Sequence, residues 1–99
     1  MAVEMLVGMD VANDEIYQQY RDAMAPILKQ HGGAFSYDFR ISEVLKSAAE
    51  GEINRVFTIC FPSQNDLDAF FSDPDYLGVK AQYFEPSVND FTIIASYTK

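Results

Sequence analysis

The side chains that could carry out acid–base chemistry are few in this sequence of 99 residues, and one of them is unique. His31 is the only histidine, and the ordinary pKa of histidine lies closer to neutrality than that of any other side chain. We therefore identify His31 as the candidate catalytic residue, in the role of general base. The alternative is a structural histidine in the last turn of a helix, where a cation suits the negative end of the helix dipole.

A second candidate is the pair Asp38 and Arg40, which stand two positions apart in the segment FSYDFRI. Residues two apart in a β-strand point to the same side of the sheet. If a second copy of the chain covers that side, the pair would orient a small polar or acidic ligand in an apolar space. The alternative is a solvent-exposed ion pair at a sheet edge, which contributes little stability.

Tyrosines form the third group, since six of them are many for one small domain. Gathered together, they would line an aromatic pocket with hydroxyl groups for hydrogen bonding. Tyr20, Tyr37 and Tyr83 are the candidate ligand-binding residues of this group, next to Asp38 and Arg40. The alternative is that the tyrosines serve the core or a dimer interface.

The sequence contains no motif typical of a metal site or of a cofactor site. One histidine, one cysteine and scattered carboxylates do not make a metal-ligand set, and no glycine-rich phosphate loop is present. Cys60 stands alone, which excludes an internal disulfide and fits a reducing compartment. We therefore predict no metal and no cofactor.

The charge balance narrows the range of partners. Fifteen acidic residues against seven basic ones give a net charge of −8. Such a surface repels phosphate backbones and anionic lipid headgroups, so we expect neither nucleic-acid nor membrane binding. The N-terminal segment MAVEMLVGMD lacks the basic region of a signal peptide, and we expect a cytoplasmic protein.

Four segments show the spacing of β-strands. Apolar residues alternate with other residues over 3–10, 35–41 and 91–97, while 55–61 is apolar on both faces, as in a central strand. The second of these segments is predicted to have one aromatic face, with Phe35, Tyr37 and Phe39, and one polar face.

Helical patterns separate these strands. Residues 14–31 form one helical segment that ends at Gly32-Gly33, because glycine readily adopts the left-handed cap conformation. Pro26 inside it predicts a kink or a break into two shorter helices. Further helical turns are expected after Ser63 and from Asp73 to Pro86. In the first helix five positions fall on one stripe at helical spacing: Ile16, Tyr20, Ala23 or Met24, Ile27 and His31.

The order strand, helix, strand, strand, helix, strand predicts a single α+β domain over residues 1–99. This is the ferredoxin-like βαββαβ arrangement, a four-stranded antiparallel sheet with helices on one face. The other face would lie open in a single chain, and hydrophobic residues make up 48% of the sequence. We therefore expect a homodimer in which two sheets pack face to face as a dimeric α/β barrel.

A series of short motifs carries a resemblance over nearly the whole chain. They are Tyr17 and Tyr20, Pro26-Ile27-Leu28, Gly32-Gly33, Glu43-Val44-Leu45, Phe61-Pro62-Ser63, Phe70-Phe71, Pro74, Tyr76 and Lys80. With these residues the chain resembles an uncharacterised family of unknown function in the dimeric α/β-barrel superfamily, related to antibiotic-biosynthesis-monooxygenase-like proteins. The resemblance implies the fold and a homodimer but no established activity. The wider superfamily includes cofactor-free monooxygenases, lactone isomerases and haem-degrading enzymes.

The chain departs from this family at two positions. Asp38 stands where relatives usually carry an arginine, and Tyr83 replaces a second arginine expected near the end of the helical segment. An anion-binding role of those arginines therefore does not transfer to this chain.

Two functions remain open from the sequence. The first is a homodimer with a cleft for a small, partly apolar molecule, which could be a cofactor-independent monooxygenase or isomerase. In that mechanism His31 or a tyrosine moves protons and Arg40 stabilises developing negative charge. The alternative is a non-enzymatic ligand-binding or structural dimer domain.

Overall fold

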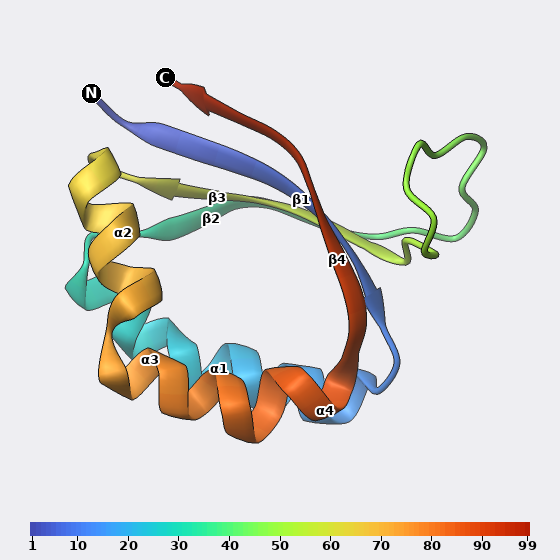
Figure 1. Cartoon of the computed structure of the whole chain (residues 1–99), viewed down its shortest axis with the longest axis horizontal. Helices are drawn as coiled ribbons and strands as arrows, with labels where there is room; N and C mark the ends of the chain where they lie inside the picture. The colour runs from blue at the N-terminus through green and yellow to red at the C-terminus, as the bar shows by residue number, and fades with distance from the viewer.

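The computed structural model describes all 99 residues, Met1–Lys99, and consists of one sheet and one layer of helices (Figure 1). The strands are β1 (Val3–Val11), β2 (Ala34–Arg40), β3 (Arg55–Phe61) and β4 (Val88–Thr98). The helices are α1 (Asp14–Gln30), α2 (Gln64–Ser72), α3 (Pro74–Val79), the π-helix η1 (Lys80–Phe84) and α4 (Glu85–Ser87).

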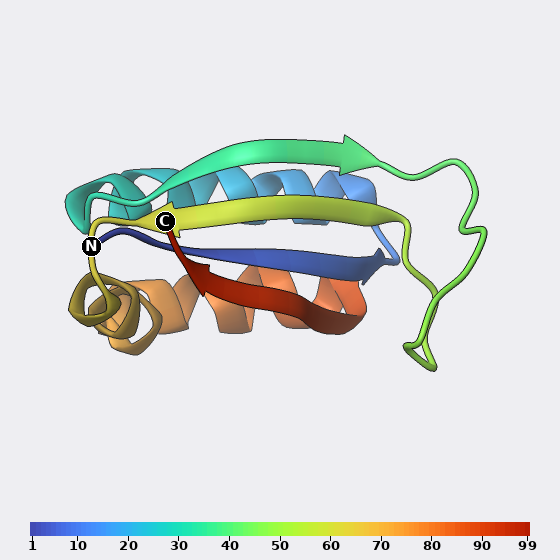
Figure 2. The same cartoon turned by 90° about the horizontal axis from the view of Figure 1, so that it is seen from above.

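The four strands form one antiparallel sheet in the order β2-β3-β1-β4. All helices cover the same face of this sheet, and Figure 2 shows α1 beneath the β2 side and α3 beneath the β4 side. The predicted α+β ferredoxin-like fold is thereby confirmed. None of the helices has both the length and the apolar character needed to cross a membrane.

Helix α1 begins and ends as its sequence predicts. The Asn13 side chain accepts a hydrogen bond from the backbone N–H of Ile16, which caps the first turn. Gly32, just after the helix, has a positive φ of 73°, a conformation that glycine adopts without steric conflict. The helix runs through Pro26 as one element, so the predicted break does not occur.

The face of α1 that packs on the sheet differs from the predicted stripe. Its buried residues are Tyr17, Tyr20, Met24 and Leu28. Ile16, Ile27 and His31 lie beside this stripe and are partly exposed. Compared with the predicted stripe, the buried face of α1 is rotated slightly about the helix axis. This rotation turns Arg21 and Tyr17 toward the sheet.

The core lies between the helices and the sheet face that they cover. Alternate residues of β1, from Val3 to Val11, and of β3, from Phe57 to Phe61, point into it. Phe70 of α2 and Tyr76 of α3 complete it from the helical layer. No helix covers the opposite face of the sheet (Figure 1).

Two irregularities in strand pairing change which residues reach the core. In β2 the register shifts between Phe35 and Tyr37. Phe35 therefore points to the helices, whereas Tyr37 and Phe39 point to the open face, where they stack with a centroid distance of 6.0 Å. The single aromatic face predicted for this strand is wrong, because a bulge adds one residue and inverts the alternation. For the same reason Asp38 faces the helices and not the open face.

The same effect occurs in the closing strand. The pairing of β1 with β4 shifts between Leu6 and Val7. Ala95 and Tyr97 therefore lie on the open face, while Phe91 and Ile93 lie on the helical side. The uniform alternation predicted over 91–97 is wrong at this bulge.

Candidate functional site

A cavity of about 300 Å³ lies between the sheet and the helices. Fifteen of its 17 lining residues are hydrophobic. Phe91 and Ile93, on the edge strand β4, are about half exposed, so the cavity is open to solvent at this edge. The lining residues are Met5, Val7, Met9, Tyr17, Tyr20, Arg21, Met24, Phe35, Phe57, Ile59, Leu67, Phe71, Tyr76, Lys80, Phe84, Phe91 and Ile93.

A buried pair of hydroxyl groups lies at this cavity. The hydroxyl oxygens of Tyr20 on α1 and Tyr76 on α3 are 2.8 Å apart and share a hydrogen bond. Burial raises the pKa of Tyr20 far above its ordinary value and also raises the pKa of Tyr76. Both hydroxyls therefore stay protonated at neutral pH. They can donate or accept hydrogen bonds, but they do not supply a phenolate base.

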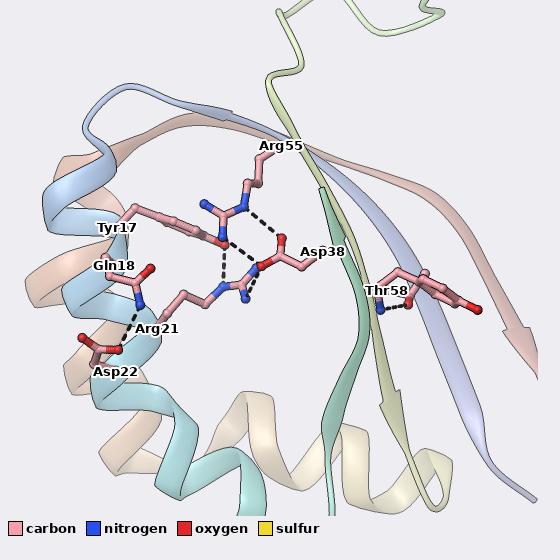
Figure 3. A network of polar contacts seen from close by, with 8 residues as sticks. Tyr17, Gln18, Arg21, Asp22, Asp38, Arg55 and Thr58 are labelled. Carbon is pink, nitrogen blue, oxygen red and sulfur yellow. Dashed lines mark hydrogen bonds and ion pairs between the residues drawn. The ribbon is translucent and has the colours of Figure 1, made fainter. Parts of the chain in front are cut away.

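A cluster of charged side chains, drawn in Figure 3, includes Arg21, which lines the same cavity. The Arg55 guanidinium binds both carboxylate oxygens of Asp38, at 2.9 and 2.8 Å, and Arg21 Nη1 donates to the same carboxylate at 3.2 Å. Arg21 Nε donates to the Tyr17 hydroxyl at 2.8 Å. Burial raises the pKa of this tyrosine. The hydrogen bond from Arg55 holds the pKa of Asp38 below its ordinary value.

The Arg21 side chain is packed among aromatic rings. Its guanidinium carbon lies 3.8 Å from the ring centroid of Phe35 and 4.9 Å from that of Phe57, both on the sheet. Such contacts between a cation and a ring face are favourable and become stronger when water is excluded. The side chain is only 11% exposed, and its Nη2 atom is buried with no hydrogen-bond partner in the protein.

The predicted catalytic residue lies outside the cavity. His31 Nε2 donates to Asp73 Oδ2 at 2.8 Å, and its ring packs edge-on against Phe70. This hydrogen bond is the main cause that lowers the pKa of Asp73, which also caps α3 through the backbone N–H of Asp75. The contact joins the end of α1 to the start of α3. The catalytic role of His31 stays a prediction.

The predicted ligand-binding residues are distributed over both sides of the sheet. Tyr20 lines the cavity, and Asp38 holds the arginine that lines it. Tyr37 is 61% exposed on the open face. Arg40 is exposed at the end of β2 and makes no side-chain hydrogen bond or ion pair, and Tyr83 packs against the core without lining the cavity. The structure therefore brings only two of the five to one place.

Four residues with polar groups that line the cavity were not among the predicted site residues: Tyr17, Arg21, Tyr76 and Lys80. Arg21 follows Tyr17 by four positions, which places both on one face of a helix. That spacing was the available signal for Arg21. Neither Tyr76 nor Lys80 has a comparable local pattern, because their position depends on how α3 and η1 pack against α1. No group of three or more His, Cys, Asp or Glu side chains is arranged to hold a metal ion.

Comparisons with known proteins agree with this architecture. A family model described as "Domain of unknown function (DUF1330)" matches residues 5–97. No curated protein matches the chain. A protein of unknown function from Rhodopseudomonas palustris, RPA0582, is similar in structure, with a TM-score of 0.80, 18% identity, and coverage of 99% of this chain and 82% of that one.

Two further solved structures share the fold. A dimeric ferredoxin-like protein of unknown function from Jannaschia sp. CCS1 has a TM-score of 0.62 and 15% identity, with 100% of both chains covered. The hydroxynitrile lyase from Passiflora edulis has a TM-score of 0.67 and 15% identity, with 97% of this chain and 91% of that chain covered. At these identities the likeness concerns the fold alone.

Proposed function

The chain belongs to the DUF1330 family of domains of unknown function, and we propose that it is a homodimer that binds a small, largely apolar molecule in the cavity of each protomer. The observation that carries this proposal is the cavity itself, with its apolar lining, its opening at the β4 edge and a buried hydroxyl pair. Ligand sites in proteins have this composition, with a few placed polar groups in a concave apolar surface.

The size of the cavity limits the size of the molecule. One water occupies about 30 Å³ in the liquid, so 300 Å³ corresponds to on the order of ten to fifteen non-hydrogen atoms. A phenyl ring with a short alkyl chain and one polar group fits this range.

Support for the dimer comes from the open face of the sheet. Tyr37, Phe39 and Tyr97 are large side chains that remain exposed there in a single chain. A second sheet packed on this face would bury them, and sheets pack in this way about 10 Å apart. The solved structure from Jannaschia sp. CCS1 is described as dimeric. Sedimentation of the purified protein gives the test, and a monomer at micromolar concentration would contradict the proposed barrel.

Ligand binding can be measured with the methionine methyl groups. Met5, Met9 and Met24 line the cavity, whereas Met1 is 89% exposed at the chain end and acts as an internal control. We expect titration with neutral 4-phenylbutan-1-ol to move the three cavity signals in a carbon–proton correlation spectrum, in a saturable way, and to leave the Met1 signal in place. Equal displacement of all four signals would contradict a cavity site.

A second candidate function is catalysis, in which the protein stabilises negative charge that develops on an oxygen of the bound molecule. The observation that favours it is the Tyr20–Tyr76 hydroxyl pair, which can donate a hydrogen bond to an oxygen that gains negative charge. The fold is compatible with catalysis, since the similar structure from Passiflora edulis is a hydroxynitrile lyase.

The enzyme hypothesis is tested with phenolic and lactone substrates, by following oxygen uptake and product formation. Turnover that is lost in Tyr20→Phe and kept in His31→Ala would assign catalysis to the cavity. Loss in His31→Ala with activity retained in Tyr20→Phe would assign it to the histidine. Binding without turnover of any substrate would favour a non-enzymatic ligand-binding domain.

A further inference from the structure

The charged groups at the cavity are all of one sign. Arg21 and Lys80 are the two lining residues that are not hydrophobic, and the lining contains no carboxylate. This is unexpected from composition, because acidic residues outnumber basic ones by 15 to 7 in the whole chain. The cavity is therefore a positively charged space in a strongly acidic protein.

The cluster beside the cavity does not balance its own charge. Arg21 and Arg55 share the single carboxylate of Asp38, and both arginine side chains are only 11% exposed. One positive charge is left uncompensated within this cluster. Asp14 attracts Arg55 from farther away without forming an ion pair. A charge that is withdrawn from water and not fully paired favours the approach of an anion.

Hydrogen bonding within the cluster is also incomplete. Nε and Nη1 of Arg21 have partners, but its buried Nη2 has none. Lys80 makes no ion pair, and it lies at the start of η1 on the cavity lining. Two cationic residues thus line the cavity, and neither has all of its polar atoms paired within the protein.

From these observations we infer that the molecule bound in the cavity is an apolar monoanion, a phenyl or alkyl carboxylate, whose charge is stabilised by Arg21 and Lys80. This inference rests on the proposed ligand-binding function and specifies its ligand class. The apolar part of the ligand packs against the aromatic and aliphatic lining, and the carboxylate supplies the negative charge that Asp38 alone does not.

The test compares three probes of nearly equal shape: 4-phenylbutanoate, its primary amide, and 4-phenylbutylamine. Binding to the full chain at pH 7.5 is followed through the methyl signals of Met5, Met9 and Met24. A hydrogen bond to a charged group contributes enough that we expect the carboxylate to bind about ten- to a hundredfold more tightly than the amide. We expect the amine to bind most weakly.

Two variants assign the preference to the named cations. Lys80→Gln and Arg21→Met are each expected to weaken binding of the carboxylate about three- to tenfold, with the affinity for the amide nearly unchanged. Lys29→Gln removes the same charge as Lys80→Gln from the exposed last turn of α1, outside the cavity, and is expected to change neither affinity. If Arg21→Met fails to fold, Lys80→Gln and the three-probe comparison still decide the question.

The possible outcomes separate the two proposals. Equal affinities of the three probes would overturn the inference of an anionic ligand and leave the ligand-binding function standing. A carboxylate preference that persists in Lys80→Gln and Arg21→Met would also overturn it. If none of the probes moves the cavity methionine signals at millimolar concentration, the ligand-binding function fails together with the inference.

Discussion

Replacing Tyr20 by Phe tests the pair of hydroxyl groups that Tyr20 and Tyr76 contribute to the cavity lining. Tyr20 and Tyr76 are 5% and 4% exposed, and their hydroxyl oxygens are 2.8 Å apart. The substitution keeps the ring and its packing, so the loss of stability has two sources. The hydrogen bond between the two hydroxyls is lost, and the Tyr76 hydroxyl stays buried with no group to bond to. An unsatisfied buried polar group costs about 1–3 kcal/mol. For a domain of this size, a loss of about 2 kcal/mol lowers the melting temperature by roughly 8–16 °C.

The double variant Tyr20→Phe/Tyr76→Phe sharpens this prediction. Because it removes both hydroxyls, no polar group is left unpaired, and we expect it to be no less stable than either single variant. Urea unfolding followed by circular dichroism, at one fixed protomer concentration, measures all three free energies of unfolding. Tyr83→Phe is the matched control, because Tyr83 lies in the helical layer, is partly exposed and makes no side-chain hydrogen bond, and the stability of this variant should differ from wild type by less than about 0.5 kcal/mol. Additive losses from the two single substitutions would refute the coupling.

Three further predictions concern the rest of the molecule. Asp38→Asn should lower the free energy of unfolding at pH 7 by about 1–3 kcal/mol, between the values for exposed and buried ion pairs. The pKa of Asp38 in the folded protein lies below its ordinary value, so its contribution to stability is present above about pH 4 and fades as the pH falls through the folded pKa. In urea unfolding, the difference in free energy of unfolding between wild type and Asp38→Asn should therefore be smaller at pH 3 than at pH 7. Gly33→Ala should lower the free energy of unfolding by about 1–3 kcal/mol in the same assay, because the new Cβ would lie 2.4 Å from Leu28 Cδ1. A variant as stable as wild type would contradict this close approach. If the proposed dimer forms through the open face, Phe39→Glu on that face should yield a monomer in sedimentation experiments, and Leu45→Glu in the exposed loop should not.

The elements of this fold could be predicted from local patterns. The alternation in β1 and the fully apolar run in β3 depend on residues that are neighbours in the chain. The ends of α1 follow from Asn13 and Gly32 for the same reason, because a cap is a contact between residues a few positions apart. The order of these elements then leaves few topologies, and the ferredoxin-like sheet is the one that forms.

The candidate site could be predicted only in part. Tyr20 and Asp38 were identified from residue type, and the structure places both at or beside the cavity. The alternation predicted that Asp38 lies on the strand face opposite to Phe35, but the structure places both on the same face. A bulge causes this difference, and a bulge is set by the pairing of two strands and has no signature in β2 alone. That one extra residue turns Asp38 toward Arg21 and Arg55 and turns Tyr37 away from them.

The sequence alone determined the secondary structure, the fold class and the acidic character of this protein, since each follows from local spacing or from composition. Tertiary structure alone decided where the cavity lies and which charges border it. Arg21, Asp38 and Arg55 come from three different elements, and only the packing of α1 against the sheet brings them to one place (Figure 3). A positively charged cavity inside an acidic chain is therefore a property of the fold, because it depends on which few side chains are withdrawn from water and not on the total charge.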